Sequence, residues 1–186
     1  MLPSDLAKYK EKSQKIIALT AWDSISGSLA EQANVDLVLV GDSLAMVCLG
    51  HKSTLPLTLE NIIYHTNAVS RGFTKKIEEQ PLVVSDMPFL TYQCGEDKAV
   101  EYAGKIIQRT YAKAVKVEGA APEIQNNLTI PTIGIGAGNF CDGQVRVTAD
   151  LLGLNDDQPP FCPPIIQGKK LFNDKLKEWV ISERLN

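Results

Sequence analysis

The sequence is poor in the residues that mark several large protein classes. Its four cysteines, at positions 48, 94, 141 and 162, lack both the paired spacing of a zinc site and the density of a secreted disulfide scaffold. No apolar run approaches the roughly 20 residues that a membrane span needs, and the first residues, MLPSDLAKYKEK, are too polar for a signal peptide. These absences predict reduced thiols, no membrane association and a cytoplasmic location.

An excess of one charge is also missing. The 19 lysines and arginines nearly balance the 22 aspartates and glutamates, and the formal net charge is −3. Proteins that bind nucleic acids or anionic lipids usually carry a basic patch, so neither partner is expected. Hydrophobic residues make up 44% of the 186 residues, which is enough to bury the core of one domain. We therefore expect a single domain over residues 1–186 that handles small molecules.

Only two histidines occur, His51 and His65. Two histidines cannot form a zinc site with cysteines at the spacings present. We expect His65, within a helical pattern near apolar residues, to be structural, and His51 to belong to a lid. The glycine-rich string GIGAGN at 134–139 lacks the third glycine spacing of a dinucleotide site and predicts a tight turn instead.

Segments with β-strand character alternate with segments of helical spacing along the chain. Strands are expected at 15–23, 35–42, 81–89, 114–119 and 130–138. Helices are expected at 24–34, 58–72, 96–112, around 122–128 and at 168–186, with a further short strand and helix within 142–153. The long connection at 43–57 is of the kind that often carries function. This alternation predicts an α/β fold of parallel βα units, either a doubly wound sheet or a barrel.

Three of these strands end on a carboxylate, at Asp42, Asp86 and Glu118. In parallel α/β folds the ligand site lies at the C-terminal ends of the strands, so the three side chains are expected to converge. Clustered carboxylates repel one another unless a cation neutralises them, and an all-oxygen site suits Mg²⁺. Any one of these residues could instead cap the following helix or lie in solvent.

Lys116 precedes Glu118 by two residues, so the alternation of a strand points both side chains the same way. A lysine beside a metal site can hold the carboxylate of a substrate. An ion pair with Glu118 or a neighbouring acid is an equally good interpretation of the same spacing.

Five blocks of sequence resemble the ketopantoate hydroxymethyltransferase family, in the order found in that family. They are VGDSLAMVCLGHKSTLPLT at 40–58, IIYHTNAVSRG at 62–72, VVSDMPF at 83–89, VKVEG at 115–119 and IPTIGIGAGNFCDGQ at 130–144. The resemblance implies a TIM barrel of eight βα units, bound Mg²⁺ and a homo-oligomer. It also implies transfer of a one-carbon unit from 5,10-methylenetetrahydrofolate to the 2-oxo acid 3-methyl-2-oxobutanoate, which gives 2-dehydropantoate for pantothenate biosynthesis.

The same resemblance assigns roles to individual residues. Asp42, Asp86 and Glu118 match the metal ligands of the family. Asp42, Ser43, Asp86 and Lys116 match its keto-acid contacts.

One part of the family pattern is absent. The glutamate taken as the catalytic base lies in a segment resembling LECVP, preceded by a block resembling GHLGLTPQ, and neither string occurs here. A full barrel takes about 250 residues. We therefore expect about six of the eight strands, a deletion junction near 119–122 and no residue in the role of the base. Nothing in the sequence recommends Glu60 or Glu123 as a replacement.

Two other functions fit the same residues. The first is an enzyme of the phosphoenolpyruvate mutase and isocitrate lyase type, which shares the metal chemistry next to a 2-oxo acid but needs no folate. The second is a non-catalytic remnant that binds magnesium and keto acid, or that joins an oligomer as an inactive subunit.

Overall fold

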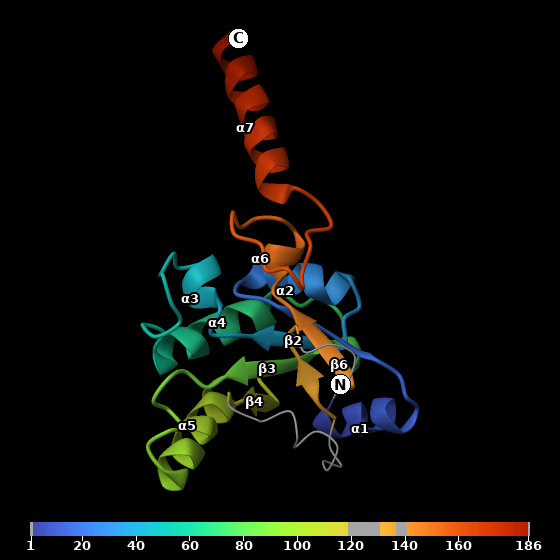
Figure 1. Ribbon diagram of the computed structural model, residues 1–186, viewed down its shortest axis with the longest axis vertical. Helices are drawn as coiled ribbons and strands as arrows, with labels where there is room; N and C mark the ends of the chain where they lie inside the picture. The colour runs from blue at the N-terminus through green and yellow to red at the C-terminus, as the bar shows by residue number, and fades with distance from the viewer. Residues whose placement is uncertain (1, 119–130, 137–140, 186) are drawn as a thin grey trace. The chain divides into compact units, whose positions relative to one another are not determined.

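The computed structural model describes residues 2–118, 131–136 and 141–185 (Figure 1). By its internal contacts the chain divides into two compact units, Met1–Val145 and Arg146–Asn186. Each unit is described by itself below. The first holds the sheet, and the second consists of helices and the loop between them.

The first unit alternates helices and strands, as the sequence pattern predicts. Its elements are α1 (Pro3–Glu11), β1 (Ile16–Thr20), α2 (Ser24–Gln32), β2 (Leu37–Val40), α3 (Leu44–Val47), α4 (Leu59–Arg71), the short 3-10 helix η1 (Ile77–Glu79), β3 (Leu82–Asp86), α5 (Glu96–Arg109), β4 (Ala114–Lys116), β5 (Ile133–Gly134) and β6 (Gly143–Arg146), whose last residue begins the second unit.

The six strands form one sheet in the order β4-β3-β2-β1-β6-β5. The pairings β1–β2, β2–β3, β3–β4 and β5–β6 are parallel. The first four strands follow the sequence order, while the last strand pairs with the first, which is how a barrel closes on itself. The sheet therefore has the strand order of a (β/α) barrel opened between β4 and β5. This confirms an incomplete barrel of six strands.

Alternate strand residues build two buried clusters on opposite faces of the sheet. On one face Val38, Val40 and Val83 pack with residues of α4 and α5, among them Ile62 and Ile106. The other face buries Ile16, Ala18, Leu37, Leu39, Leu82, Val84 and Val145 together with Leu6 of α1. Strands buried on both faces explain why β2 and β3 are apolar almost throughout.

Two helix starts are fixed by side chains that the sequence places just before them. Ser26 donates its backbone N–H to Asp23 Oδ1 at 2.7 Å at the start of α2. Asn61 donates to Thr58 Oγ1 at 3.2 Å at the start of α4. Such caps satisfy backbone donors that have no partner inside the helix.

The elements differ from the expected ones mainly in length. The strands are shorter than predicted, and β5 takes up two of the six described residues, 131–136, within the predicted 130–138. Helices α1 and α3 and the turn η1 were not predicted. The helix predicted around 122–128 and the junction predicted near 119–122 lie outside the described residues.

The second unit contains α6 (Thr148–Leu151), an irregular loop and α7 (Gly168–Leu185). Backbone hydrogen bonds of 2.9 Å from Ile165 to Leu151 and from Gly168 to Leu152 hold the end of the loop against α6. The predicted helix at 168–186 is thus present. Its large apolar side chains are exposed, namely Leu171, Phe172, Leu176, Trp179, Val180, Ile181 and Leu185. None of the helices in the described residues has the length and apolar character to cross a membrane.

Candidate metal and substrate site

The C-terminal ends of three adjacent strands bring together the charged residues singled out in the sequence. Asp42 follows β2 by two residues, Asp86 ends β3, and Lys116 ends β4 with Glu118 two residues beyond it. Asp86 and Lys116 are register partners in the parallel pairing of β3 with β4. The expected convergence of the strand-end carboxylates is therefore observed.

The cluster is compact and already contains one cation. One oxygen from each of Asp42, Asp86 and Glu118 lies within 4.8 Å of the others. The Lys116 Nζ donates to both Asp86 oxygens, at 2.8 and 2.9 Å, and to Glu118 Oε1 at 2.5 Å. The backbone N–H of Asp42 donates to Asp86 Oδ2 at 3.0 Å. Both interpretations of Lys116 remain compatible with this geometry, because a lysine in an ion pair also stands beside the candidate metal ligands.

Burial differs sharply across the cluster. The Asp86 side chain is 1% exposed, that of Lys116 is 32% exposed and that of Glu118 is 59% exposed. Burial raises the pKa of Asp86 above its usual value, although Lys116 and the Asp42 N–H oppose the shift. Burial acts to lower the pKa of Lys116, but the carboxylates of Asp86 and Glu118 outweigh it and raise that pKa. Lys116 is therefore an ammonium ion at neutral pH.

The residues present fit a divalent metal ion. With Lys116 protonated, three ionised carboxylates leave a net charge of −2 in the cluster. Two oxygens on opposite sides of Mg²⁺ are about 4.2 Å apart, because Mg–O bonds measure about 2.1 Å. Neighbouring oxygens on the same ion are only about 3.0 Å apart, so the observed spread of up to 4.8 Å exceeds that of a bound magnesium site by up to roughly 2 Å. The side chains would have to move together to place the three oxygens on one ion.

A carboxylate that caps the following helix, which was the alternative role for these acids, is found at a different residue. Asp23, at the end of the segment predicted as the first strand, is the cap of α2. Helix α3 follows Asp42 and Ser43 and has no side-chain cap hydrogen bond. Asp86 directs both oxygens to Lys116 and one of them also to the N–H of Asp42. Neither Asp42 nor Asp86 caps the helix that follows it, and Asp86 instead contacts Lys116 of β4 and the backbone after β2.

Buried contacts behind the cluster hold the strand ends in place, and no sequence pattern pointed to them. Thr66 of α4 and Ser85 of β3 share a buried hydrogen bond of 2.9 Å between their hydroxyls. The N–H of Met87 donates to the carbonyl of Lys116 at 3.0 Å, which ties the end of β3 to that of β4. These bonds fix the backbone on both sides of Asp86.

The remaining predicted residues are placed as follows. Ser43 precedes α3 next to Asp42, and its hydroxyl makes no cap hydrogen bond. His51 is exposed in the loop after α3, and its assignment to a lid stays a prediction. His65 Nδ1 lies 2.5 Å from the Trp22 carbonyl, so the ring donates that hydrogen and has the structural role expected of it.

The two acids considered as substitute bases are not part of the cluster as described. Glu60 on α4 is bound by both terminal nitrogens of Arg109, at 2.6 and 2.7 Å. The hydrogen bonds from Arg109 hold the pKa of Glu60 below its usual value, which makes it a weaker base. Glu123 lies outside the described residues.

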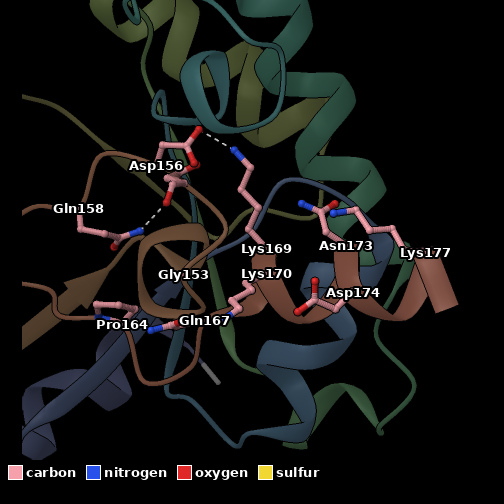
Figure 2. Close-up of a pocket in the computed structure, with 11 residues that line it drawn as sticks. Gly153, Asp156, Gln158, Pro164, Gln167, Lys169, Lys170, Asn173, Asp174 and Lys177 are labelled. Carbon is pink, nitrogen blue, oxygen red and sulfur yellow. Dashed lines mark hydrogen bonds and ion pairs between the residues drawn. The ribbon is translucent and has the colours of Figure 1, made fainter.

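A separate cavity of about 460 Å³ lies in the second unit (Figure 2). Within it Lys169 forms an ion pair with Asp156 at 2.5 Å, and Gln158 donates to the Asn155 carbonyl at 2.8 Å. The lining residues are Gly153, Asn155, Asp156, Gln158, Pro164, Gln167, Lys169, Lys170, Asn173, Asp174 and Lys177. None of them was predicted to bind a ligand, and the carboxylate cluster remains the better candidate because its charges converge on the buried Asp86.

Comparison with known proteins identifies the family. The model of the family described as ketopantoate hydroxymethyltransferase matches residues 1–125 and 120–184. The chain belongs to the ketopantoate hydroxymethyltransferase family. It is 67% identical to the 3-methyl-2-oxobutanoate hydroxymethyltransferase of Prochlorococcus marinus (strain MIT 9312) over 257 residues, which cover all of both proteins. It is 43% identical to the enzyme of that name from Synechococcus sp. (strain CC9605) over 255 residues, which cover 99% of the chain and 94% of the relative.

The lengths of these alignments carry further information. An alignment of 257 positions exceeds the 186 residues of this chain by 71, so at least that many positions of the family have no counterpart here. The family match is also divided in two, and its parts meet at residues 120–125. Both findings are consistent with an internal deletion in a ketopantoate hydroxymethyltransferase.

Proposed function

We propose that the chain keeps the Mg²⁺ and keto-acid site of a ketopantoate hydroxymethyltransferase but lacks the group that drives turnover. The intact reaction in this proposal moves a hydroxymethyl unit from 5,10-methylenetetrahydrofolate to 3-methyl-2-oxobutanoate and gives 2-dehydropantoate. The observation that carries the proposal is the charged cluster at the ends of β2, β3 and β4, where three carboxylate oxygens lie within 4.8 Å.

Asp42, Asp86 and Glu118 are the proposed ligands of the ion. Mg²⁺ at this position supplies positive charge that stabilises the enolate of the bound 2-oxo acid. The backbone N–H of Asp42 and the ammonium group of Lys116 orient the buried Asp86, because each donates to one or both of its oxygens. Ser43, next to Asp42, is the proposed hydroxyl contact of the keto acid.

Lys116 has a second task in this proposal. It neutralises Asp86 and Glu118 at distances of 2.5 to 2.9 Å. A divalent ion on the same carboxylates would take over that neutralisation and leave the ammonium group to bind the carboxylate of the keto acid. Metal and keto acid are therefore expected to bind cooperatively, each strengthening the binding of the other.

Loss of turnover follows from the missing base. The proton on the carbon next to the ketone is only weakly acidic, so a positioned base is needed even when the carbonyl is polarised. The segment that resembles the base-carrying part of the family is absent from the sequence, and at least 71 positions of the relatives lack a counterpart. The divided family match supports a junction near 119–122.

The test separates binding from turnover. Isothermal titration of 3-methyl-2-oxobutanoate into the chain is expected to show binding in the presence of Mg²⁺ and at least tenfold weaker binding in EDTA. Asp86→Asn should abolish the metal-dependent part, while Asp97→Asn, an exposed acid at the start of α5, should not. An assay of 2-dehydropantoate formation is expected to show no product. Keto-acid binding that ignores Mg²⁺ would refute the site.

The phosphoenolpyruvate mutase and isocitrate lyase alternative gains no support from the relatives, which are named as hydroxymethyltransferases. Formation of product without added folate would revive it.

We further propose a cytoplasmic homo-oligomer. The exposed apolar side chains of α7 support self-association, because contiguous apolar surface of that kind usually marks an interface. Light scattering coupled to size exclusion measures the mass directly, and a monomer at micromolar concentration would contradict the proposal.

A further inference from the structure

A small cavity lies at the end of the sheet opposite to the carboxylate cluster. It is formed where the chain enters β3 and β4, beneath the C-terminal end of α4. Its volume is about 280 Å³, and we call it the entry pocket. The lining residues are Ser70, Arg71, Phe73, Ile77, Gln80, Pro81, Val83, Tyr111 and Lys113.

The wall of the entry pocket is largely apolar. Pro81 and Val83 are buried at its base, and Phe73 is partly buried. Ile77 is 66% exposed and Tyr111 is 65% exposed, so apolar surface continues to the mouth of the pocket. Large apolar side chains that gather around a concavity gain stability when a ligand covers them.

Two cations at the pocket have no acidic partner. Within the described residues neither Arg71 nor Lys113 forms an ion pair or a side-chain hydrogen bond. Arg109, by contrast, is paired with Glu60 through two hydrogen bonds. An apolar cavity with two uncompensated positive charges suits a ligand that is both apolar and anionic.

We propose that the entry pocket binds a small apolar carboxylate. Its volume equals that of about nine water molecules at roughly 30 Å³ each, which is ample room for one aromatic ring with a carboxyl group. The ring would lie among Phe73, Ile77 and Tyr111, with the carboxylate toward the cations. Such a charged hydrogen bond is stronger than a neutral one.

The entry pocket is distinct from the metal and substrate site. Val83 of β3 precedes Asp86 by three positions, and Lys113, the residue before β4, precedes Lys116 by three positions. Three residues of a strand span roughly 10 Å. A ligand in the pocket therefore cannot contact the carboxylates, yet it contacts the two strands that position them.

Benzoate and its neutral analogue benzamide are suitable probes for the full chain. Titration followed by two-dimensional NMR is expected to give at least tenfold tighter binding of benzoate, with shifts at Phe73 and Val83. The double variant Arg71→Gln/Lys113→Gln should weaken benzoate binding at least tenfold and leave benzamide unchanged. Lys76→Gln removes an exposed charge from the same loop without touching the pocket and serves as the matched control.

Several outcomes would overturn the proposal. Equal affinity for the two probes would show that the cations take no part, and an unchanged affinity in the double variant would show the same. Loss of benzoate binding in Asp86→Asn would place the ligand in the carboxylate cluster instead. A change of oligomer mass in the double variant, without probe binding to the unmodified chain, would identify the pocket as a protein interface. Circular dichroism of each variant establishes that it is folded.

Discussion

Two regions of the chain, up to the end of β4 and from β5 onward, contribute differently to the sheet, the core and the candidate site. Residues 2–118 contribute four strands paired in sequence order, most of both buried clusters and all four charged residues of the site. Residues 131–136 and 141–185 contribute two short strands, a four-residue helix and α7 with its apolar side chains exposed. On the function proposed above, the deletion spares the binding site of the first region and removes the catalytic base and the strands that would close the barrel.

The largest expected effect comes from restoring what lies between the two regions. Insertion of the unmatched residues of the Prochlorococcus marinus relative between Gly119 and Pro122 should raise the rate of 2-dehydropantoate formation about 10²- to 10⁴-fold, because a positioned base contributes that much. A steady-state assay measures it. The same insertion in an Asp86→Asn background is the control and should stay inactive. A rate in the unmodified chain equal to that of the relative would contradict the prediction, because it would show that the chain does not lack a catalytic base.

The second prediction compares the stability of the two regions. Ile62 of α4 is fully buried, whereas Trp179 of α7 is 60% exposed. Ile62→Ala should lower the free energy of unfolding by about 2–5 kcal/mol through a cavity. Trp179→Ala should change it by less than about 0.5 kcal/mol in the isolated chain. Urea denaturation followed by circular dichroism gives both values.

An equally large cost for Trp179→Ala would show that α7 is buried under the conditions of the experiment. A concentration-dependent cost would assign that burial to a second copy of the chain.

The third prediction concerns charge within the site itself. Lys116→Met removes the cation that neutralises Asp86 and Glu118, so the affinity for Mg²⁺ should rise about tenfold while the affinity for the keto acid falls about tenfold. Isothermal titration measures both constants. Lys76→Met, which removes an exposed charge outside both the cluster and the entry pocket, is the matched control. Weaker Mg²⁺ binding in Lys116→Met would show that the lysine organises the ligands more than it competes with the metal.

Much of the first region could be predicted from the sequence. Nearly continuous apolar runs located β2 and β3, because strands that are buried on both faces are apolar throughout. The convergence of Asp42, Asp86 and Glu118 followed from the rule that parallel strands end on one side of the sheet. The hydrogen bonds of Thr66 with Ser85 and of Asp42 with Asp86 could not be predicted, since they depend on packing between segments far apart in sequence.

The second region was less predictable for physical reasons. The spacing of Leu171, Leu176 and Trp179 predicted α7 correctly, because helical periodicity is local. The periodicity gave no information on what covers the apolar side of α7, and within the described residues these side chains stay exposed. The periodicity also gave no sign that βα units are missing, because the residues between β4 and β5 are enough for an ordinary crossover between parallel strands. Chain length and the family pattern carried that inference instead.

The smallest effect is expected at Asp142, which ties the two regions together. It accepts hydrogen bonds from the backbone and hydroxyl of Thr132 at 2.9 and 3.1 Å and pairs with Lys10 of α1 at 3.3 Å. Burial acts to raise its pKa, but these partners outweigh burial and hold the pKa below 3.8.

A carboxyl group whose pKa is depressed in the folded state stabilises the fold above its unfolded pKa, and this contribution is lost as the pH falls through the folded value. Asp142→Asn should therefore lower the free energy of unfolding by about 1 kcal/mol at pH 7 and by less at pH 3. Urea titrations of both proteins at the two pH values measure the difference. Asp157→Asn, an exposed aspartate without an ion pair among the described residues, is the control. A difference that grows at pH 3 would mean that Asp142 is held in its protonated form and that its ion pair with Lys10 of α1 does not stabilise the fold.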